Sequence, residues 1–318
     1  YGLYDAPDPS SQIACSIGVK VGENAGSVHC LKYGLTVHNV LERTGGTMEG
    51  ELTTIGSEAL DAPGLDLLAL MHGSEGMLGV IVEVKVQLLP HPLTKAVLMA
   101  SFDNVEHGGH AVAGIIARGI IPGGLEMMDG AAIQAAEDFV HAGYDTDAAA
   151  ILICELDGSE AEVADQMTAV QDCLREHGAT RIQVAEDDEA KARFWAGRKA
   201  AFPAVGRISA DYYCMDGTIP RKQLAYVLRR ISELSAEQGL ETVNVFHAGD
   251  GNLHPLILFD GNKPGQLEAA ETLGSEILQL CVEVGGTVTG EHGVGVEKIN
   301  EMCVQFATSE IEQFHAIK

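Results

Sequence analysis

The sequence predicts an α+β fold for the larger, C-terminal part of the chain, and three observations support this. Apolar, β-branched strand-like runs alternate with helical patterns from residue 95 to residue 260. Strands joined by single helices, together with one predicted hairpin, are typical of a ferredoxin-like layer with helices on one face of a sheet. The composition also changes after Pro92, which marks the start of this layer.

The individual elements follow from local signals. Acidic residues at the start of a helical run and Pro220 at the first position of another mark helix N-termini. The predicted strands are 95–102, 124–129, 149–156, 180–187, 211–219, 241–247 and 255–260. The predicted helices are 105–119, 130–143, 159–176, 187–202, 220–238 and 265–284, followed by a closing helix.

The first 92 residues have a different character. They are rich in Gly, Ser and Asn, which suits loops whose backbone approaches a ligand closely. A strand over 80–89 ends at a Pro-His-Pro break. We therefore expect two domains, 1–92 and 93–318. Because Tyr1 runs directly into a loop-like stretch, we also expect the chain to be a fragment of a longer protein.

Composition excludes some functions. The 318 residues carry 46 acidic and 20 basic side chains, a formal charge of −26, which argues against nucleic acid or an anionic membrane as the main partner. Seven scattered cysteines without a C-x-x-C pair indicate reduced thiols and a cytoplasmic protein. No apolar run reaches the roughly 18–20 residues of a membrane span.

The stretch "NVFHAGDGNLHPLILFD" (244–260) is the first candidate site. Its Gly-Asp-Gly-Asn turn lies between two apolar runs, which predicts a hairpin. A hairpin would bring His247 and His254 together, within reach of one ion. Imidazole suits Zn, Mn or Fe, and a third ligand is needed. The alternative is that both histidines only hydrogen-bond locally.

The stretch "GGTVTGEHGVGVEKI" (285–299) is the second. Glycines on both sides of Glu291 and His292 let two adjacent side chains face one pocket. Glu291 would complete a His-His-Glu ligand set, and His292 would remain as a base near neutral pH. Alternatively, Glu291 is only an acidic residue near the N-terminus of the closing helix.

Two weaker signals remain. Arg198, in "FWAGRKAAFPA" (194–204), could bind a substrate carboxylate through two hydrogen bonds, although a lone arginine is more often a solvated side chain. The small residues of "PDPSSQIACSIG", "VGENAG" and "GSEGMLGVI" would permit a phosphate or an extended cofactor. None of these stretches has the spacing of a dinucleotide-binding or P-loop motif.

Taken together in order, "PDPSSQIACSIG", "GSEGMLGVI", "HAGDGNLHPLILFD" and "GGTVTGEHGVG" resemble the FAD-linked oxidases. These have a vanillyl-alcohol-oxidase (PCMH) type flavin domain and include the flavoprotein subunits of glycolate oxidases and the D-lactate dehydrogenases. The resemblance implies a partial PCMH-type FAD-binding domain in 1–92 and a substrate-binding cap in 93–318. It also implies oxidation of a 2-hydroxy acid to a 2-keto acid, with hydride transfer to flavin N5.

The resemblance gives the candidate residues their roles. His247, His254 and Glu291 would bind a divalent metal, Zn, Mn or Fe. His292 would be the base and Arg198 would bind the substrate carboxylate. The residues expected along the flavin are Pro9, Ser10, Ser16, Ile17, Gly18, Glu75, Gly76, Gly79, Val80 and Ile81.

Three departures from the family pattern bear on this expectation. In the family, the flavin domain begins with an earlier Gly-rich segment that holds the FAD diphosphate, and we expect that segment to lie outside this sequence. Val19 and Lys20 stand where the usual Ile-Gly-Gly-Asn has Gly and Asn, so they add a branched side chain and a charge. Two glycines weaken an expected strand in 41–51. The chain alone is therefore expected to hold FAD weakly and to be inactive by itself.

Two other functions stay open at this stage. One is a metal-dependent hydrolase that uses His247, His254 and Glu291 to activate water. The other is a truncated, non-catalytic flavoprotein-subunit fragment. For the oxidase, the expected partners are a small 2-hydroxy acid, an electron-accepting partner such as an iron–sulfur subunit, and a second copy of the chain. An association with the inner membrane would then occur only through partners.

Overall fold

The computed structural model describes residues 1–9, 14–59 and 64–318, which form two compact units. One unit comprises Tyr1–His91 together with Thr289–Lys318, and the other comprises Pro92–Val288. The break at residue 91 lies one residue from the predicted boundary. The last thirty residues differ from the expectation, because they group with the first unit rather than with the cap.

The second unit is built on a seven-stranded antiparallel sheet of order β10-β14-β12-β7-β8-β6-β9. In chain order, the first four strands of this sheet are β6 (Thr94–Phe102), β7 (Gly124–Asp129), β8 (Ala150–Gly158) and β9 (Ala179–Val184). The others are β10 (Asp211–Cys214), β12 (Glu241–Phe246) and β14 (Pro255–Phe259). A separate pair joins β11 (Gly217–Thr218) to β13 (Asn252–Leu253).

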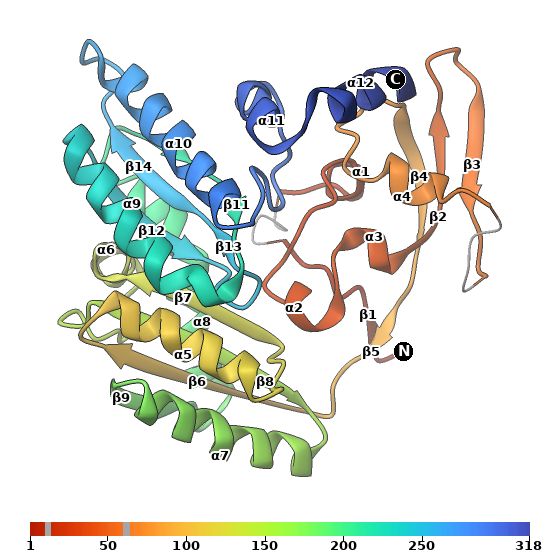
Figure 1. The fold of residues 1–318 in the computed structure, drawn as a ribbon. Coiled ribbons are helices and arrows are strands. Elements are labelled where there is room, and N and C mark those ends of the chain that lie inside the picture. Colours follow the sequence, from red (N-terminus) through yellow and green to blue (C-terminus); the bar gives the residue numbers. More distant parts are fainter. Residues whose placement is uncertain (10–13, 60–63) are drawn as a thin grey trace. The chain divides into compact units, whose positions relative to one another are not determined.

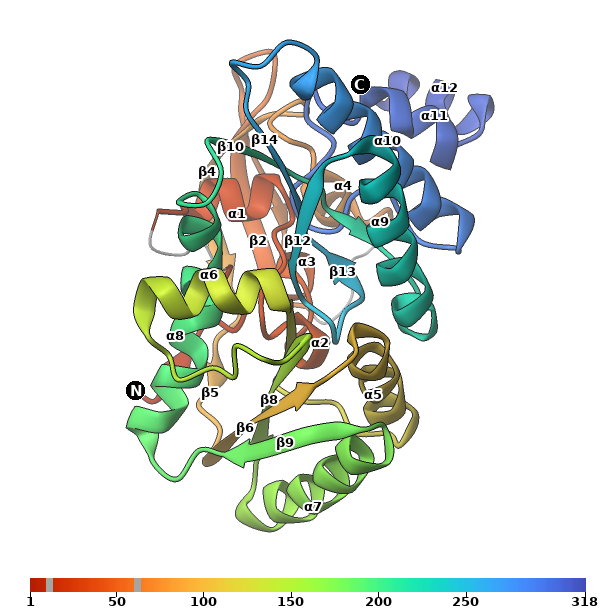
Figure 2. The ribbon, with the colours of Figure 1, turned by 90° about the vertical axis from the view of Figure 1, so that its left-hand side faces the viewer.

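Helices cover both faces of this sheet (Figures 1 and 2). One face carries α5 (Val105–Ala117), α7 (Glu160–Glu176), α9 (Leu224–Gln238) and α10 (Gln266–Glu283), with the 3-10 turn η1 (Arg221–Gln223) before α9. The other face carries α6 (Gly130–Val140) and α8 (Asp188–Val205). The expectation of helices on one face was therefore wrong.

The reason is visible in the central strands. In β8 every residue from Ala150 to Asp157 is buried, so side chains pointing to both faces are covered. A strand with only one covered face would instead alternate apolar and polar residues. The continuous apolar run "AAILICEL" already carried that information, and helices on both faces are its physical consequence.

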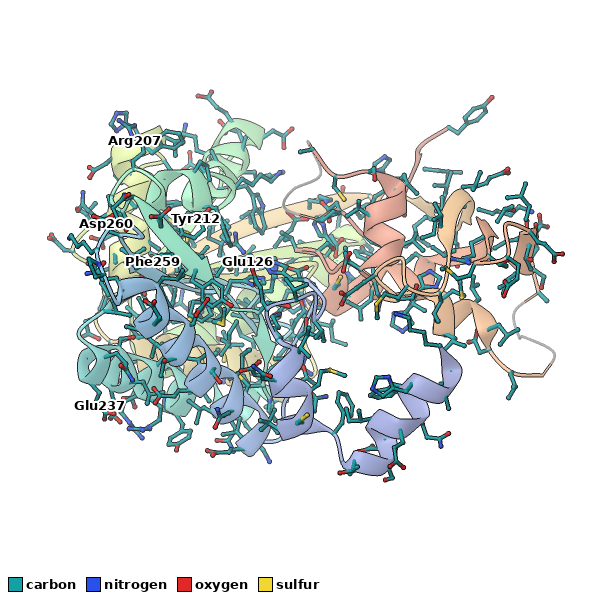
Figure 3. All side chains as sticks on the ribbon, turned by 90° about the horizontal axis from the view of Figure 1, so that it is seen from above. Glu126, Arg207, Tyr212, Glu237, Phe259 and Asp260 are labelled. Atoms are coloured by element: carbon teal, nitrogen blue, oxygen red, sulfur yellow. The ribbon has the colours of Figure 1, made fainter. Side chains whose placement is uncertain are left out.

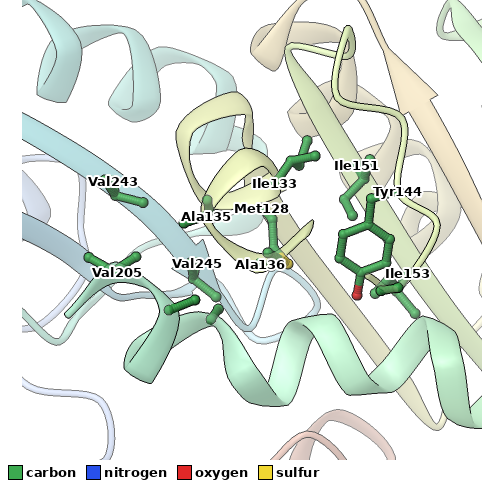
Figure 4. Close-up of a cluster of buried hydrophobic side chains, with 14 of the residues drawn as sticks. Met128, Ile133, Ala135, Ala136, Tyr144, Ile151, Ile153, Val205, Val243 and Val245 are labelled. Carbon is green, nitrogen blue, oxygen red and sulfur yellow. The ribbon is translucent and has the colours of Figure 1, made fainter. Parts of the chain in front are cut away.

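The core between the sheet and the α6–α8 layer is a continuous apolar cluster (Figure 4). Side chains of alternate strand residues meet the inner faces of the two helices. Full burial of one such side chain stabilises the fold by about 1.5–3 kcal/mol. The labelled members from the sheet are Met128, Ile151, Ile153, Val243 and Val245, and those from the helices are Ile133, Ala135, Ala136 and Val205.

Asp129 connects this layer to the sheet. As the N-cap of α6, its Oδ1 accepts a hydrogen bond from Ala132 N at 3.0 Å. Its Oδ2 accepts from Asn244 N at 2.7 Å and from Asn244 Nδ2 at 2.9 Å. One carboxylate therefore caps a helix and ties β12 to the end of β7.

The first unit contains a three-stranded sheet, β3-β2-β4, and a pair β1–β5. Its strands are β1 (Leu3–Tyr4), β2 (Val40–Gly46), β3 (Leu52–Gly56), β4 (Val80–Val86) and β5 (Leu89–Pro90). Its helices are α1 (Ile17–Gly22), α2 (Cys30–Tyr33), α3 (Thr36–Asn39), α4 (Leu67–Met71), α11 (Ile299–Gln305) and α12 (Thr308–Ile317).

The glycines of 41–51 do not prevent a strand from forming there. Gly45 and Gly46 lie inside β2 and pair with β3 and β4. A Cβ on Gly45 would lie 2.8 Å from Nη2 of Arg43, whose side chain is only 3 % exposed. The glycine thus makes room for a buried guanidinium in the same strand.

Many of the exposed large apolar side chains among the described residues belong to the first unit. Leu52, Leu65, Val80 and Val82 are 70, 86, 69 and 65 % exposed, respectively. Contiguous exposed apolar surface usually marks an interaction site. Among the described residues, no helix is both long and apolar enough to cross a bilayer.

Replacing Asp129 with alanine is expected to destabilise the second unit by about 3 kcal/mol. The change removes a helix cap and leaves Asn244 without its carboxylate partner. Ser159→Ala is the matched control, because Ser159 caps α7 at an exposed position with one bond, to Glu162 N. Its expected cost is about 1 kcal/mol. Denaturant unfolding measures both, and equal costs would show that the tie to β12 contributes nothing.

Candidate functional site

The predicted hairpin at residues 241–259 is confirmed. β12 and β14 pair antiparallel from Glu241–Leu258 to Asn244–Pro255. At its end, His247 N donates to Asn252 O at 3.1 Å, and Asn252 N donates to His247 O at 3.2 Å. Gly251 has φ +73°, and a side chain there would collide with the carbonyl oxygen of Ile219. The turn residues therefore fix the backbone positions of both histidines.

The hairpin brings His247 and His254 together, as the sequence predicted. Their ring centroids lie 5.2 Å apart with the planes at 84°. Both side chains are buried, with 2 % of each residue exposed. Two imidazoles this close, held away from bulk water, offer two nitrogen donors of the kind that Zn²⁺ and related cations prefer.

Glu126 of β7 is the residue that sequence reasoning missed. β12 pairs with β7 in the register Val245–Met128 and Phe246–Met127, so the next position places Glu126 beside His247. Glu126 Oε1 lies 2.8 Å from His247 Nδ1, and Glu126 is 1 % exposed. Figure 3 labels this side chain within the second unit. An acidic residue inside the strand "GLEMMD" was the available signal.

Arg198 of α8 completes this buried cluster. Its Nε donates to Glu126 Oε2 at 2.8 Å, and its Nη2 lies 2.8 Å from the same oxygen. Burial alone raises the pKa of the Glu126 carboxyl. Electrostatic interactions and hydrogen bonds with His247 and Arg198 outweigh burial and hold that pKa below its usual range. The carboxylate is therefore charged, and Arg198 is not the solvated helix residue that a lone arginine usually is.

His254 has polar and aromatic neighbours of its own. Its Nδ1 lies 3.9 Å from Oδ1 of Asp216, a fully buried residue. The ring of Phe202 packs edge-on at 6.2 Å between centroids. Each histidine thus has a carboxylate near one ring nitrogen, and the contact of His247 is the closer of the two.

Glu291 and His292 lie in the first unit, in a loop shaped by glycines. His292 Nε2 and Glu291 Oε1 are 3.9 Å apart. Gly293 has φ +82°, and a side chain on Gly26 would collide with the Glu291 carboxylate. Gly26 therefore makes space for Glu291, while a Cβ on Gly293 would collide with the carboxylates of Glu75 and Glu23.

Glu75 holds the same loop. Its carboxylate accepts hydrogen bonds from Val294 N at 2.6 Å and from Gly295 N at 2.8 Å. These bonds explain why the loop groups with the first unit and not with the cap. The structure thus pairs His247 with His254 in one unit, and Glu291 with His292 in the other. The role of Glu291 as a third ligand stays a prediction.

The N-terminal flavin candidates surround α1. Ser16 Oγ accepts from Val19 N at 3.2 Å and caps this helix, which begins at Ile17. Ile17 and Val19 are about half exposed, while Lys20 is buried in an ion pair with Asp5. The added charge at residue 20 is thus neutralised within its own unit. Ser10, another candidate, lies outside the described residues.

The backbone of the loop from Glu75 to Ile81 can lie close to a bound ligand. Glu75, Gly76 and Gly79 have φ values of +51°, +76° and +151°. A Cβ on Gly76 would meet no atom within 4 Å, and Val80 is 69 % exposed. Open glycine backbone beside exposed apolar side chains fits the flat, apolar face of an isoalloxazine ring. These residues therefore fit FAD.

Comparison with known proteins gives the chain its relatives. The family described as FAD linked oxidases, C-terminal domain, matches residues 91–318. Glycolate oxidase subunit GlcD of Escherichia coli (strain K12) is 64 % identical over 318 residues, covering all of this chain and 64 % of the relative. The protein of the same name from Bacillus subtilis (strain 168) is 34 % identical, with 68 % of its length covered. The chain thus spans about two thirds of the length of these relatives.

Solved structures show the same fold at low identity. A p-cresol methylhydroxylase with bound substrate superposes with a TM-score of 0.74 at 14 % identity. The match covers 99 % of this chain and 68 % of that one. At this identity the likeness concerns the fold alone.

His72, which precedes the Glu75 loop, predicts a pH dependence of stability. Its Nδ1 donates to Leu68 O at 2.7 Å, and burial lowers its pKa below the ordinary 6.5. The unfolded chain therefore takes up a proton more readily than the folded one. Stability is full above pH 6.5 and falls below it, by at most about 1.4 kcal/mol per pH unit.

Unfolding experiments between pH 8 and pH 5 test this prediction by comparing the wild type with His72→Gln. The variant is expected to lose stability less steeply below pH 6.5. Parallel pH profiles would contradict the assignment.

Proposed function

The chain belongs to the FAD-linked oxidases, and from this premise we propose that it serves the FAD-dependent oxidation of a small 2-hydroxy acid to the 2-keto acid. Glycolate and D-lactate are the substrate types that we propose. The observation that carries the proposal is the buried His247–His254 pair within the matched domain. The identity to a glycolate oxidase subunit over the whole chain supports it.

The first unit would contribute the flavin side of the site. We propose that Pro9, Ser10, Ser16, Ile17, Gly18 and the Glu75–Ile81 loop, including Gly76, Gly79 and Val80, line the FAD. Bound FAD supplies the hydride acceptor, flavin N5. The chain's own part is to offer open glycine backbone and apolar side chains there.

The second unit would contribute two ligands of a metal site. His247 and His254 supply two imidazole nitrogens, and we propose Glu291 as a carboxylate ligand, which rests on residue chemistry alone. A bound divalent cation, Zn, Mn or Fe, would supply Lewis-acid polarisation of the substrate hydroxyl. The donor set of two imidazoles and one carboxylate fits these ions.

His292 and Arg198 would act on the substrate itself. His292, with a half-exposed side chain, is the group that we propose to take up the hydroxyl proton. Arg198 would bind the substrate carboxylate through the guanidinium N–H groups that Glu126 does not use. Because Nε and Nη2 of Arg198 already contact Glu126, this arginine would bind Glu126 and the substrate carboxylate at the same time.

The two alternatives are less well supported. A metal-dependent hydrolase would use the same three ligands but would leave the flavin-side loops without a role. Family membership does not favour it. A non-catalytic fragment would have no need of the buried cluster around His247. We further propose that the protein works as a subunit beside an electron-accepting partner, because the E. coli relative is named as a subunit.

The metal claim has a direct test. Elemental analysis of the purified protein is expected to find about one divalent cation per chain. His254→Ala should lose most of it, because one of the imidazole donors is gone. His110→Ala is the matched control, as His110 is exposed on α5. A wild type without metal, or equal metal in all three proteins, would contradict the proposal.

The oxidation itself is tested in the full-length protein, with glycolate or D-lactate and an artificial electron acceptor. His292→Asn is expected to lower kcat by about 10²–10⁴-fold, because it removes the proton acceptor. Flavin absorbance should stay at the wild-type level, which shows that the cofactor is retained. Full activity of His292→Asn would exclude it as the base.

A further inference from the structure

The cluster of Glu126, His247 and Arg198 joins three elements of the second unit. Glu126 comes from β7, His247 follows β12, and Arg198 lies on α8. All three are at most 2 % exposed. A buried carboxylate costs free energy unless it is paired and hydrogen-bonded, and here each of its oxygens has a partner.

The contact with His247 determines which nitrogen of the imidazole ring carries the proton. Glu126 Oε1 lies 2.8 Å from Nδ1, and a carboxylate can only accept a hydrogen bond. Nδ1 must therefore carry the proton. In a neutral ring, the lone pair is then on Nε2, so Nε2 is the nitrogen that can bind a metal. Carboxylate–histidine–metal arrangements of this kind orient the ligand ring and raise its basicity.

Arg198 explains why the carboxylate stays in place. Nε and Nη2 both approach Oε2, which leaves Oε1 directed at His247. The guanidinium charge balances the carboxylate within the cluster.

We propose that Glu126 and Arg198 form a positioning pair that holds His247 as the Nδ1–H tautomer and presents its Nε2 to the divalent cation. This inference rests on the proposed metal site. Glu126 is here a positioning residue, because it acts through His247. Arg198 is first its partner in the pair, so binding of substrate by Arg198 is secondary to this role.

A merely structural ion pair between α8 and the sheet is the competing explanation. It would stabilise the fold and would leave the His247 tautomer and the metal affinity unaffected. Glu155 provides a matched control for that explanation. It is also a buried glutamate of the sheet, 6 % exposed, and it accepts from Lys95 Nζ at 2.8 Å and from Trp195 Nε1 at 3.1 Å.

The first measurement needs no metal and is made on the wild-type protein. Nitrogen-15 NMR of the histidine side chains in metal-free wild type at pH 8, with His247→Asn to assign the signals, reports which ring nitrogen is protonated. We expect His247 to be protonated at Nδ1 and not at Nε2. A proton on Nε2, alone or in an imidazolium, would overturn the inference.

The second measurement is the affinity of the full chain for Zn²⁺ by chelator competition. Glu126→Gln is expected to weaken binding by about 10–100-fold, with the His247 proton shared between both ring nitrogens. Glu155→Gln should stay within about twofold of the wild type. Equal Zn²⁺ affinity in Glu126→Gln and wild type, or equal losses in both variants, would overturn the positioning role.

The two measurements separate this inference from the proposed function. If the wild type binds no Zn²⁺, the metal proposal fails. The claim that Nε2 of His247 is presented to a cation then fails with it. The tautomer measurement still decides whether Glu126 fixes the ring. If wild type binds Zn²⁺ and His247 carries its proton on Nε2, the metal proposal stands and the positioning pair is wrong.

Discussion

The charge balance around Glu126 is the constraint on which the rest of the second unit's chemistry depends. One buried carboxylate meets an imidazole on one oxygen and a guanidinium on the other. Each group would be costly in the interior alone, and removing one partner of such a cluster typically costs 3–5 kcal/mol, as an order-of-magnitude value. The sheet and α8 must therefore keep their register for the site to exist.

Backbone constraints act together with this charge balance. Gly251 makes the turn that returns the chain from His247 toward His254, Gly26 leaves space for Glu291, and Gly293 leaves space for Glu75. In both units, glycines lie beside the side chains that bear the chemistry. The glycine-rich appearance of the sequence is thus a consequence of close packing around polar groups rather than of flexibility.

The sequence was informative where the signal is local. The hairpin, the strands of the larger unit and the convergence of His247 and His254 follow from turn residues and apolar runs. Glu126 was missed because its partners lie 72 and 121 residues away, and only strand register and helix packing join them. The grouping of 289–318 with the first unit likewise depends on tertiary contacts, whereas the apolar run of β8 already indicated helices on both faces.

The central claim is that His247 and His254 bind a divalent cation in an FAD-linked oxidase. Anomalous diffraction at the zinc edge from crystals of the full-length protein soaked in Zn²⁺ tests it most directly. The account predicts one strong peak about 2.0–2.1 Å from Nε2 of His247, with His254 as a second ligand. A peak at Nδ1 of His247, or no peak near either histidine, would contradict it.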